Sequence, residues 1–135
     1  RAAGHNLIPT STGAAIAVTK ALPQFEKKFD GISIRAPVLV GSIVDVTFVS
    51  KRQTTVEEVN AILSAAALDD RWKGIFAVTN EQLVSSDIVG RLEGSIADLS
   101  LTRVVGGTLV KVLAWYDNEM GYANTLLKHV ILAGK

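Results

Sequence analysis

The feature that most constrains the fold is an abrupt change of pattern near the end of the chain. Residues 108–114 form an apolar run that predicts a β-strand, and a helical pattern follows that ends near Ala133. The connection is Trp115-Tyr116-Asp117-Asn118-Glu119-Met120-Gly121-Tyr122. Two aromatics, an amide between two carboxylates and a Gly-Tyr pair are too polar for a plain strand-to-helix turn. The segment between strand and helix is therefore a candidate binding site.

The rest of the chain predicts an α+β fold. Strands are predicted at residues 31–35, 42–49, 74–79, 83–87, 94–101 and 108–116, with Gly106-Gly107 as the turn before the last one. One helix follows a cap supplied by Thr10, Ser11 or Thr12, and a second follows a capping box of Thr55 and Glu58. We expect a largely antiparallel or mixed sheet with about three helices on one face.

Length and composition limit what this domain can be. The 135 residues make one domain or part of one, and a hydrophobic fraction of 48% excludes disorder. No apolar run approaches the roughly 20 residues that a membrane span requires, and the N-terminus lacks a signal-peptide pattern. The chain opens with Arg1 and its only methionine is Met120. This predicts a processed or truncated product of a longer protein.

Charge and cysteine content exclude several chemistries. Fourteen basic and thirteen acidic residues give a net charge of +1, so we expect neither a nucleic-acid nor a membrane partner. The doublets Lys27-Lys28 and Lys51-Arg52 and the carboxylate pairs Asp69/Asp70 and Asp117/Glu119 are predicted to be solvated. The absence of cysteine excludes disulfides, zinc-thiolate sites and a cysteine nucleophile within this chain. We expect no metal site, since His5 and His129 are far apart in the sequence.

Three places combine residues suited to a ligand. Thr10-Ser11-Thr12-Gly13 opens a helix and is either an ordinary cap or an anion site, because a helix N-terminus offers free N–H groups. Arg35 ends an apolar strand and is either an edge-of-sheet arginine or a phosphate ligand. Asn118 offers a carbonyl and an amino group that complement a ligand carboxamide, although a capped helix start with Tyr122 as a core aromatic fits equally well.

These segments together resemble one enzyme family. The phosphorylating glyceraldehyde-3-phosphate dehydrogenases carry W-Y-D-N-E-x-G-Y near the end of their catalytic domain, as residues 115–122 do here. A second block agrees: Arg1-Ala2-Ala3, followed by Asn6-Leu7-Ile8-Pro9-Thr10-Ser11-Thr12-Gly13-Ala14-Ala15. The resemblance covers the later part of the family's chain. One departure follows Arg35, where many members read R-V-P-T-P-N-V-S and this chain has Arg35-Ala36-Pro37-Val38-Leu39-Val40-Gly41-Ser42.

The resemblance implies roles for particular residues. Thr12 and Gly13 match the residues that hold the attacking inorganic phosphate, and Arg35 matches the arginine that contacts the phosphates of both substrate and incoming phosphate. Asn118 matches the residue that anchors the nicotinamide carboxamide, and Tyr122 packs near the same ring. Residues 1–5 resemble the end of a loop that contacts the cofactor and a neighbouring subunit.

The resemblance also implies that the reacting groups lie elsewhere. In the family, the nucleophilic cysteine, the general-base histidine and the nucleotide-binding domain all precede the residue matching Arg1. We therefore expect residues 1–135 to be a partial catalytic domain with no catalytic residue of its own, inactive alone. The intact enzyme would be a cytoplasmic homotetramer that uses NAD, with NADP left open. Two alternatives remain: erythrose-4-phosphate dehydrogenase, and a non-catalytic interaction domain that retains the fold.

Overall fold

The computed structural model describes residues 2–134, which divide between Leu39 and Val40 into two compact units. The first unit contains a small sheet with a helix. Its elements are η1 (Ala3–His5), β1 (Ile8–Ser11), α1 (Ala14–Ala21), η2 (Pro23–Phe25) and β2 (Ile32–Arg35). Strands β1 and β2 pair antiparallel, with Ile8 opposite Arg35 and Ser11 opposite Ile32. Helix α1 ends just before Pro23, because proline removes a backbone donor and clashes with the preceding turn.

The second unit is built on a four-stranded mixed sheet. Its elements are β3 (Ser42–Val49), α2 (Val56–Leu68), η3 (Asp70–Trp72), β4 (Phe76–Thr79), α3 (Ser85–Ile88), β5 (Ser95–Val105), β6 (Leu109–Tyr116) and α4 (Met120–Ala133). The strand order is β3-β6-β5-β4, where β4 and β5 run parallel and the other neighbours antiparallel. Glycines 106 and 107 form the turn between β5 and β6, as predicted. These elements confirm the predicted α+β class.

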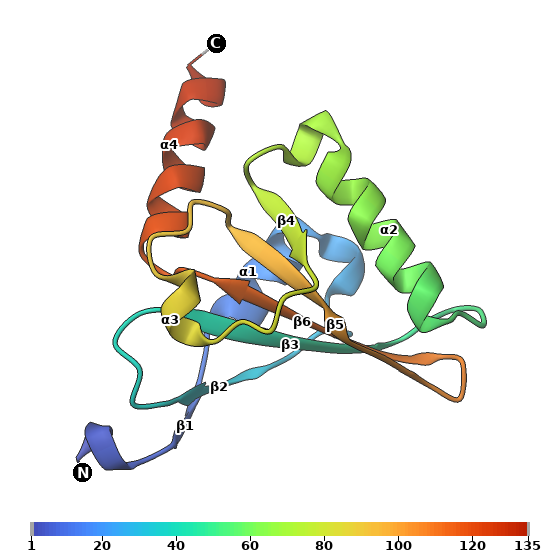
Figure 1. Ribbon diagram of the computed structural model, residues 1–135, viewed down its shortest axis with the longest axis horizontal. Helices are drawn as coiled ribbons and strands as arrows, with labels where there is room; N and C mark the ends of the chain where they lie inside the picture. Colours follow the sequence, from blue (N-terminus) through green and yellow to red (C-terminus); the bar gives the residue numbers. More distant parts are fainter. Residues whose placement is uncertain (1, 135) are drawn as a thin grey trace. The chain divides into compact units, whose positions relative to one another are not determined.

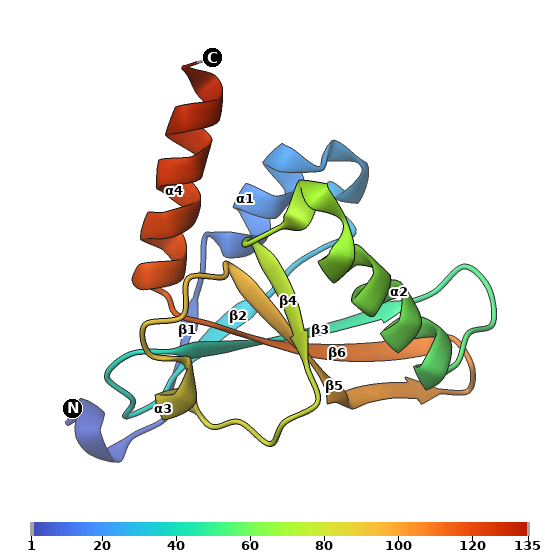
Figure 2. The same ribbon diagram turned by 45° about the horizontal axis from the view of Figure 1, so that its top comes forward.

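Helix α2 covers the sheet at β4 and β5 (Figures 1 and 2). The core of this unit is apolar and centres on β5 and β6: its buried members are Ile88, Ile96, Ala97, Leu99, Val110 and Ala114. Burial of such side chains contributes about 1.5–3 kcal/mol each for the larger ones. The helices do not share one covering role, because α1 belongs to the first unit and α4 rises from the end of β6 (Figure 2).

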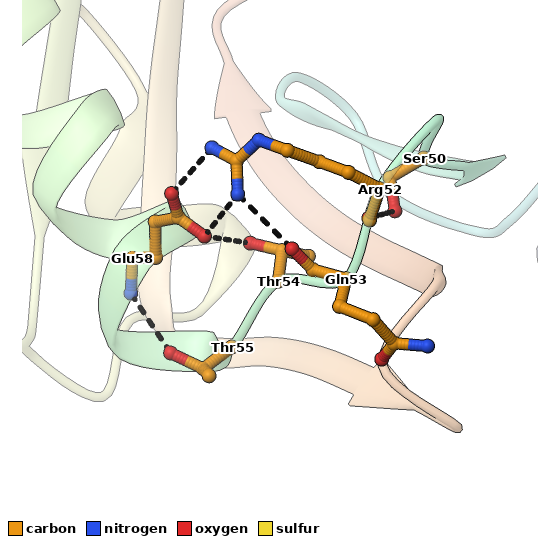
Figure 3. A network of polar contacts seen from close by, with 6 residues as sticks. All are labelled: Ser50, Arg52, Gln53, Thr54, Thr55 and Glu58. Atoms are coloured by element: carbon orange, nitrogen blue, oxygen red, sulfur yellow. Dashed lines mark hydrogen bonds and ion pairs between the residues drawn. The ribbon is translucent and has the colours of Figure 1, made fainter.

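The start of α2 is held by a polar network (Figure 3). The Thr55 hydroxyl accepts a hydrogen bond from the Glu58 N–H at 3.2 Å, which confirms the predicted cap. The Glu58 carboxylate binds Arg52 at 2.5 and 3.1 Å and accepts from the Thr54 hydroxyl at 2.7 Å. The hydrogen bond from Arg52, with that from Thr54, lowers the pKa of Glu58 to about 2. The second half of a capping box is thus replaced by an ion pair.

The elements predicted from the sequence differ from the structure in two places. Residues 83–87 were predicted as a strand, but Ser85–Ile88 form the short helix α3, in which the Asp87 carboxylate accepts from the Val84 N–H at 2.8 Å. Residues 8–11 form the strand β1, where the sequence predicts no strand and offers Thr10 and Ser11 only as possible caps. Pro9 argued against a strand in the sequence, because proline cannot donate a hydrogen bond in a ladder and occurs in strands mainly at sheet edges.

Helix α4 leaves much of its apolar surface uncovered within its unit. Leu126, Leu127 and Val130, which helical periodicity places on one face, are 47%, 59% and 59% exposed. The N-terminal end is packed more closely, because Gly121 is buried and a Cβ placed there would lie 2.6 Å from the Glu93 carbonyl oxygen. Within residues 2–134, no helix is both long and apolar enough to cross a bilayer.

Candidate functional site

The polar segment predicted to be a site lies where β6 ends and α4 begins. Asp117 fixes this junction through three backbone groups. Its Oδ1 accepts from the N–H groups of Glu119 and Met120, and its Oδ2 accepts from the Gly90 N–H, each at 2.8 Å. These hydrogen bonds, led by that from Gly90, lower the pKa of the Asp117 carboxyl. Asp117 thus caps α4 and ties it to the segment after α3.

Asp117 corrects a prediction made from the sequence. It was expected to be a solvated carboxylate, but only 2% of the residue is exposed. The sequence pattern did not show the Gly90 donor, because Gly90 lies 27 residues earlier in the chain. Its neighbour Glu119 is exposed, as predicted. Asp69 is only partly exposed and pairs with Arg71, whose hydrogen bonds lower the pKa of Asp69 to about 2.

Asn118 is held beside this junction with one end of its amide occupied. Its Oδ1 accepts from the Gly41 N–H at 3.0 Å. The contact follows from the strand register: Ser42 lies opposite Tyr116 in the antiparallel β3–β6 pair, so the residue before β3 meets those after β6. The residue is exposed, and within residues 2–134 no hydrogen bond from its Nδ2 is found. Asn118 therefore presents a free donor to solvent or to a ligand.

Tyr122 lies one turn further along α4 and is 65% exposed. It is not the core aromatic that a purely structural role for this segment requires. A recess of about 360 Å³ flanks the same junction and is lined chiefly by Val40, Val89, Met120 and Ala123. The junction thus combines exposed polar and aromatic groups with a shallow apolar surface.

The strand leading to Asn118 is anchored by Trp115. The indole Nε1 donates to Asp98 Oδ2 at 3.2 Å, and Asp98 is 2% exposed. The other oxygen of Asp98 accepts from the Ser100 hydroxyl at 2.6 Å and the Ser100 N–H at 3.2 Å. Buried polar groups stabilise a structure only when they are satisfied. Here they fix the end of β6 from the side of β5.

In the first unit, Thr12 and Gly13 lie at the start of α1. The N-cap of α1 is Gly13 and not one of the hydroxyl residues predicted for it. The Thr12 Oγ1 accepts from the Ala14 N–H at 3.1 Å and so satisfies one backbone donor at the start of the helix. Gly13 precedes the helix with φ −80°, and a Cβ placed there would meet nothing within 4 Å. Neither conformation nor packing within residues 2–134 requires glycine here. Close approach of a ligand to the backbone is a reason that remains.

Arg35 ends β2 and is exposed. Within residues 2–134 no acidic side chain pairs with it, so the guanidinium is not committed to a structural ion pair. Its register partner is Ile8, at the opposite end of β1 from Thr12. At about 3.3 Å per residue, the backbones of Thr12 and Arg35 are separated by about 13 Å along the ladder. An extended arginine side chain must span much of that distance if both are to reach one anion.

The structure therefore divides the predicted residues into two groups. Thr12, Gly13 and Arg35 belong to the β1–α1–β2 unit, and Asn118 and Tyr122 belong to the sheet unit. Arg1, at the start of the predicted loop segment, lies outside the described residues. Sequence reasoning missed Gly41 and Gly90 as partners of the second group. Within residues 2–134, no cluster of three histidine, cysteine, aspartate or glutamate side chains is arranged to hold a metal.

Comparison with known proteins shows which family the chain is similar to. Residues 1–118 match the model of the family described as "Glyceraldehyde 3-phosphate dehydrogenase, C-terminal domain". A glyceraldehyde-3-phosphate dehydrogenase of Streptomyces coelicolor is 47% identical over 134 residues, which make up 99% of this chain and 40% of that protein. One from Zymomonas mobilis is 46% identical over 94% of the chain and 38% of its own length. One from Mycobacterium avium is 45% identical over the whole chain and 39% of its own length.

The chain belongs to the glyceraldehyde-3-phosphate dehydrogenase C-terminal domain family. It spans about two fifths of the length of the relatives it matches. Asn118 is the last residue within the matched family range, and Tyr122 lies beyond it.

Proposed function

We propose that this chain forms the C-terminal, substrate-binding part of the catalytic domain of a phosphorylating glyceraldehyde-3-phosphate dehydrogenase. The intact enzyme would convert glyceraldehyde 3-phosphate, inorganic phosphate and NAD to 1,3-bisphosphoglycerate in glycolysis. The observation that carries the proposal is 47% identity to such an enzyme over 99% of the chain. Two exposed groups support it: the Arg35 guanidinium, which has no acidic partner within residues 2–134, and the Asn118 Nδ2, whose amide oxygen alone is bound, by the Gly41 N–H.

In this proposal, the first unit binds phosphate. Gly13 and the free N–H groups of the first turn of α1 would receive the attacking inorganic phosphate, assisted by the positive end of the helix dipole. The Thr12 hydroxyl would donate a hydrogen bond to a phosphate oxygen while its oxygen accepts one from the Ala14 N–H. Arg35 would bind phosphate oxygens through two parallel N–H groups, which a planar guanidinium supplies.

The sheet unit would orient the nicotinamide. The Asn118 Nδ2 is a free donor next to a fixed acceptor end, and this fits the oxygen of a carboxamide. Tyr122, which belongs to the same motif and is also exposed, would pack near the ring. Bound NAD would supply the hydride acceptor for aldehyde oxidation. The choice between NAD and NADP would rest with residues that read the ribose in a nucleotide-binding domain outside this chain.

The reacting groups would come from the rest of the enzyme. The chain contains no cysteine, so the thiolate nucleophile must be supplied elsewhere. By the resemblance to the family, the histidine base that activates it also lies outside this chain. We propose that residues 1–135 are a partial catalytic domain for this reason, inactive alone. By family membership we also infer a cytoplasmic homotetramer for the intact enzyme.

The proposal is tested by a chimera in which this chain replaces the aligned segment of the Streptomyces coelicolor relative. We expect NAD reduction that requires both glyceraldehyde 3-phosphate and inorganic phosphate, with the unmodified relative as the positive control. A kcat/KM that is larger with erythrose 4-phosphate than with glyceraldehyde 3-phosphate would favour the alternative, erythrose-4-phosphate dehydrogenase. A folded chimera that binds neither phosphate nor NAD would contradict the proposal and favour a non-catalytic domain.

A further inference from the structure

The amide of Asn118 has two chemically different ends, and the structure commits one of them. The oxygen accepts hydrogen bonds and the nitrogen donates them. Rotation about the last side-chain torsion of asparagine is only weakly restricted, so an untethered amide can present either end. The Gly41 N–H is a donor and can pair only with the oxygen, which it does at 3.0 Å. The nitrogen is thereby the end that remains for a ligand.

Gly41 can supply this N–H because of its own conformation. Its φ is +96°, a region that residues with a side chain rarely adopt. A Cβ at this position would also lie 3.0 Å from the carbonyl oxygen of Ser85 in α3. The backbone at residue 41 is thus fitted closely between α3 and the end of β6. This is also the stretch in which the sequence departs from the family turn after Arg35.

The backbone of Asn118 is fixed independently. The preceding residue, Asp117, is buried. One of its carboxylate oxygens accepts hydrogen bonds from the N–H groups of Glu119 and Met120, and the other accepts one from the Gly90 N–H. The main chain on either side of Asn118 therefore has little freedom, and the side-chain amide can still rotate about its last torsion. The hydrogen bond from the Gly41 N–H to the Asn118 Oδ1 restricts that rotation.

We propose that Gly41 is a positioning residue that fixes the Asn118 amide as a hydrogen-bond donor to the nicotinamide carboxamide. This rests on the proposed function of Asn118. A carboxamide bound to a donor must present its oxygen, whereas one bound to a rotated amide could present its amino group. The tether therefore selects one orientation of the ring, and with it the face from which hydride is transferred.

The test compares Gly41→Ala with Gly106→Ala in the full-length enzyme that contains this chain. Gly106 also has a positive φ, +58°, and nothing within 4 Å of a Cβ placed there, so Gly106→Ala puts an alanine at positive φ away from the site. We expect Gly41→Ala to raise the KM for NAD about 2- to 12-fold, the equivalent of one neutral hydrogen bond. It should also lower the stereochemical fidelity of hydride transfer to deuterated cofactor and leave the KM for aldehyde unchanged. Gly106→Ala should change none of these.

A second variant keeps the test decisive if Gly41→Ala folds poorly. Gly41→Asn should recover part of the fidelity, because asparagine tolerates positive φ better than alanine and retains the N–H. Equal effects of Gly41→Ala and Gly106→Ala, or full fidelity in Gly41→Ala, would overturn the tether. Asn118→Ala separates the two hypotheses. If it leaves NAD binding and fidelity intact, the proposed function of Asn118 fails; if it impairs them while Gly41→Ala does not, only the tether fails.

Discussion

At the scale of single residues, two of the candidate phosphate ligands, Arg35 and Gly13, make no side-chain contact that the fold requires within residues 2–134, whereas Thr12 accepts a hydrogen bond from the Ala14 N–H. Arg35 is exposed and has no acidic partner within residues 2–134. Gly13 has an ordinary negative φ and open space where a side chain would stand. Substitutions at these two positions should therefore affect ligand binding more than folding, and this separates a binding role from a structural one.

Arg35→Ala in the intact enzyme should lower kcat/KM for the phosphorylated aldehyde by about 10- to 150-fold, since a charge-assisted hydrogen bond contributes roughly 1.5–3 kcal/mol. Arg35→Lys should recover only part of the loss, because an ammonium cannot make the bidentate contact. The measurement is steady-state kinetics with varied aldehyde and varied inorganic phosphate. An aldehyde without phosphate is the control, and an equal loss with that substrate would make Arg35 structural.

Gly13→Ala should leave the melting temperature of the enzyme nearly unchanged, because the added methyl meets nothing within 4 Å. The KM for inorganic phosphate should rise several-fold if an anion approaches the backbone at the start of α1. Thermal melts and phosphate saturation curves measure the two effects separately. A lower melting temperature with an unchanged KM for phosphate would show that the glycine serves the fold.

Asp117 carries a prediction about pH. Its folded-state pKa lies below the ordinary value of 3.8, so the ionised carboxylate stabilises the fold fully above that pH. The contribution is lost as the pH falls below 3.8 through the folded-state pKa. Asp117→Asn should lower the melting temperature at neutral pH, because one end of an amide must face N–H donors. The difference from wild type should shrink as the solution is acidified. Glu119→Gln, at an exposed neighbour, should show no such dependence.

At the scale of elements, close packing explains the glycine of the aromatic motif. A Cβ at position 121 would lie 2.6 Å from the Glu93 carbonyl oxygen, which belongs to the backbone and cannot rotate away. Gly121→Ala should therefore destabilise the protein by about 1–3 kcal/mol, as overpacking does elsewhere. Urea unfolding measures the change. Gly134→Ala is the control, because its nearest neighbour would be at 3.5 Å, an ordinary contact; equal losses would refute the packing argument.

The elements were predictable where a pattern extends over a whole segment. The strand predicted at residues 42–49 is β3, and Thr55 with Glu58 correctly predicted the start of α2. Prediction failed where a single contact decides. Asp87 turns residues 85–88 into a helix through the Val84 N–H, and Pro9 conceals an edge strand. At the candidate site, Asn118 was predictable from the motif, whereas Gly41 and Gly90 were not, since only the fold brings them there.

At the scale of the whole molecule, the composition sets a limit on chemistry. The 135 residues contain no cysteine, so no thiolate can attack an aldehyde. The purified chain should show no NAD reduction with glyceraldehyde 3-phosphate and inorganic phosphate. The assay requires that mass spectrometry exclude contaminating full-length enzyme. Measurable turnover by the 135-residue species would contradict the proposal that the reacting groups lie outside this chain.

The Trp115–Asp98 contact has an optical consequence. Trp115 is half-buried with its indole N–H bound to a buried carboxylate, whereas Trp72, the second tryptophan of the chain, is 45% exposed. The two fluorophores thus sit in different surroundings, and Trp115 stands three residues before Asn118. Reduced nicotinamides absorb light in the range where indoles emit. A dihydronicotinamide bound at Asn118 would therefore accept excitation energy from Trp115 and quench its emission, so the strand that supports the site also supplies an intrinsic probe of its occupancy.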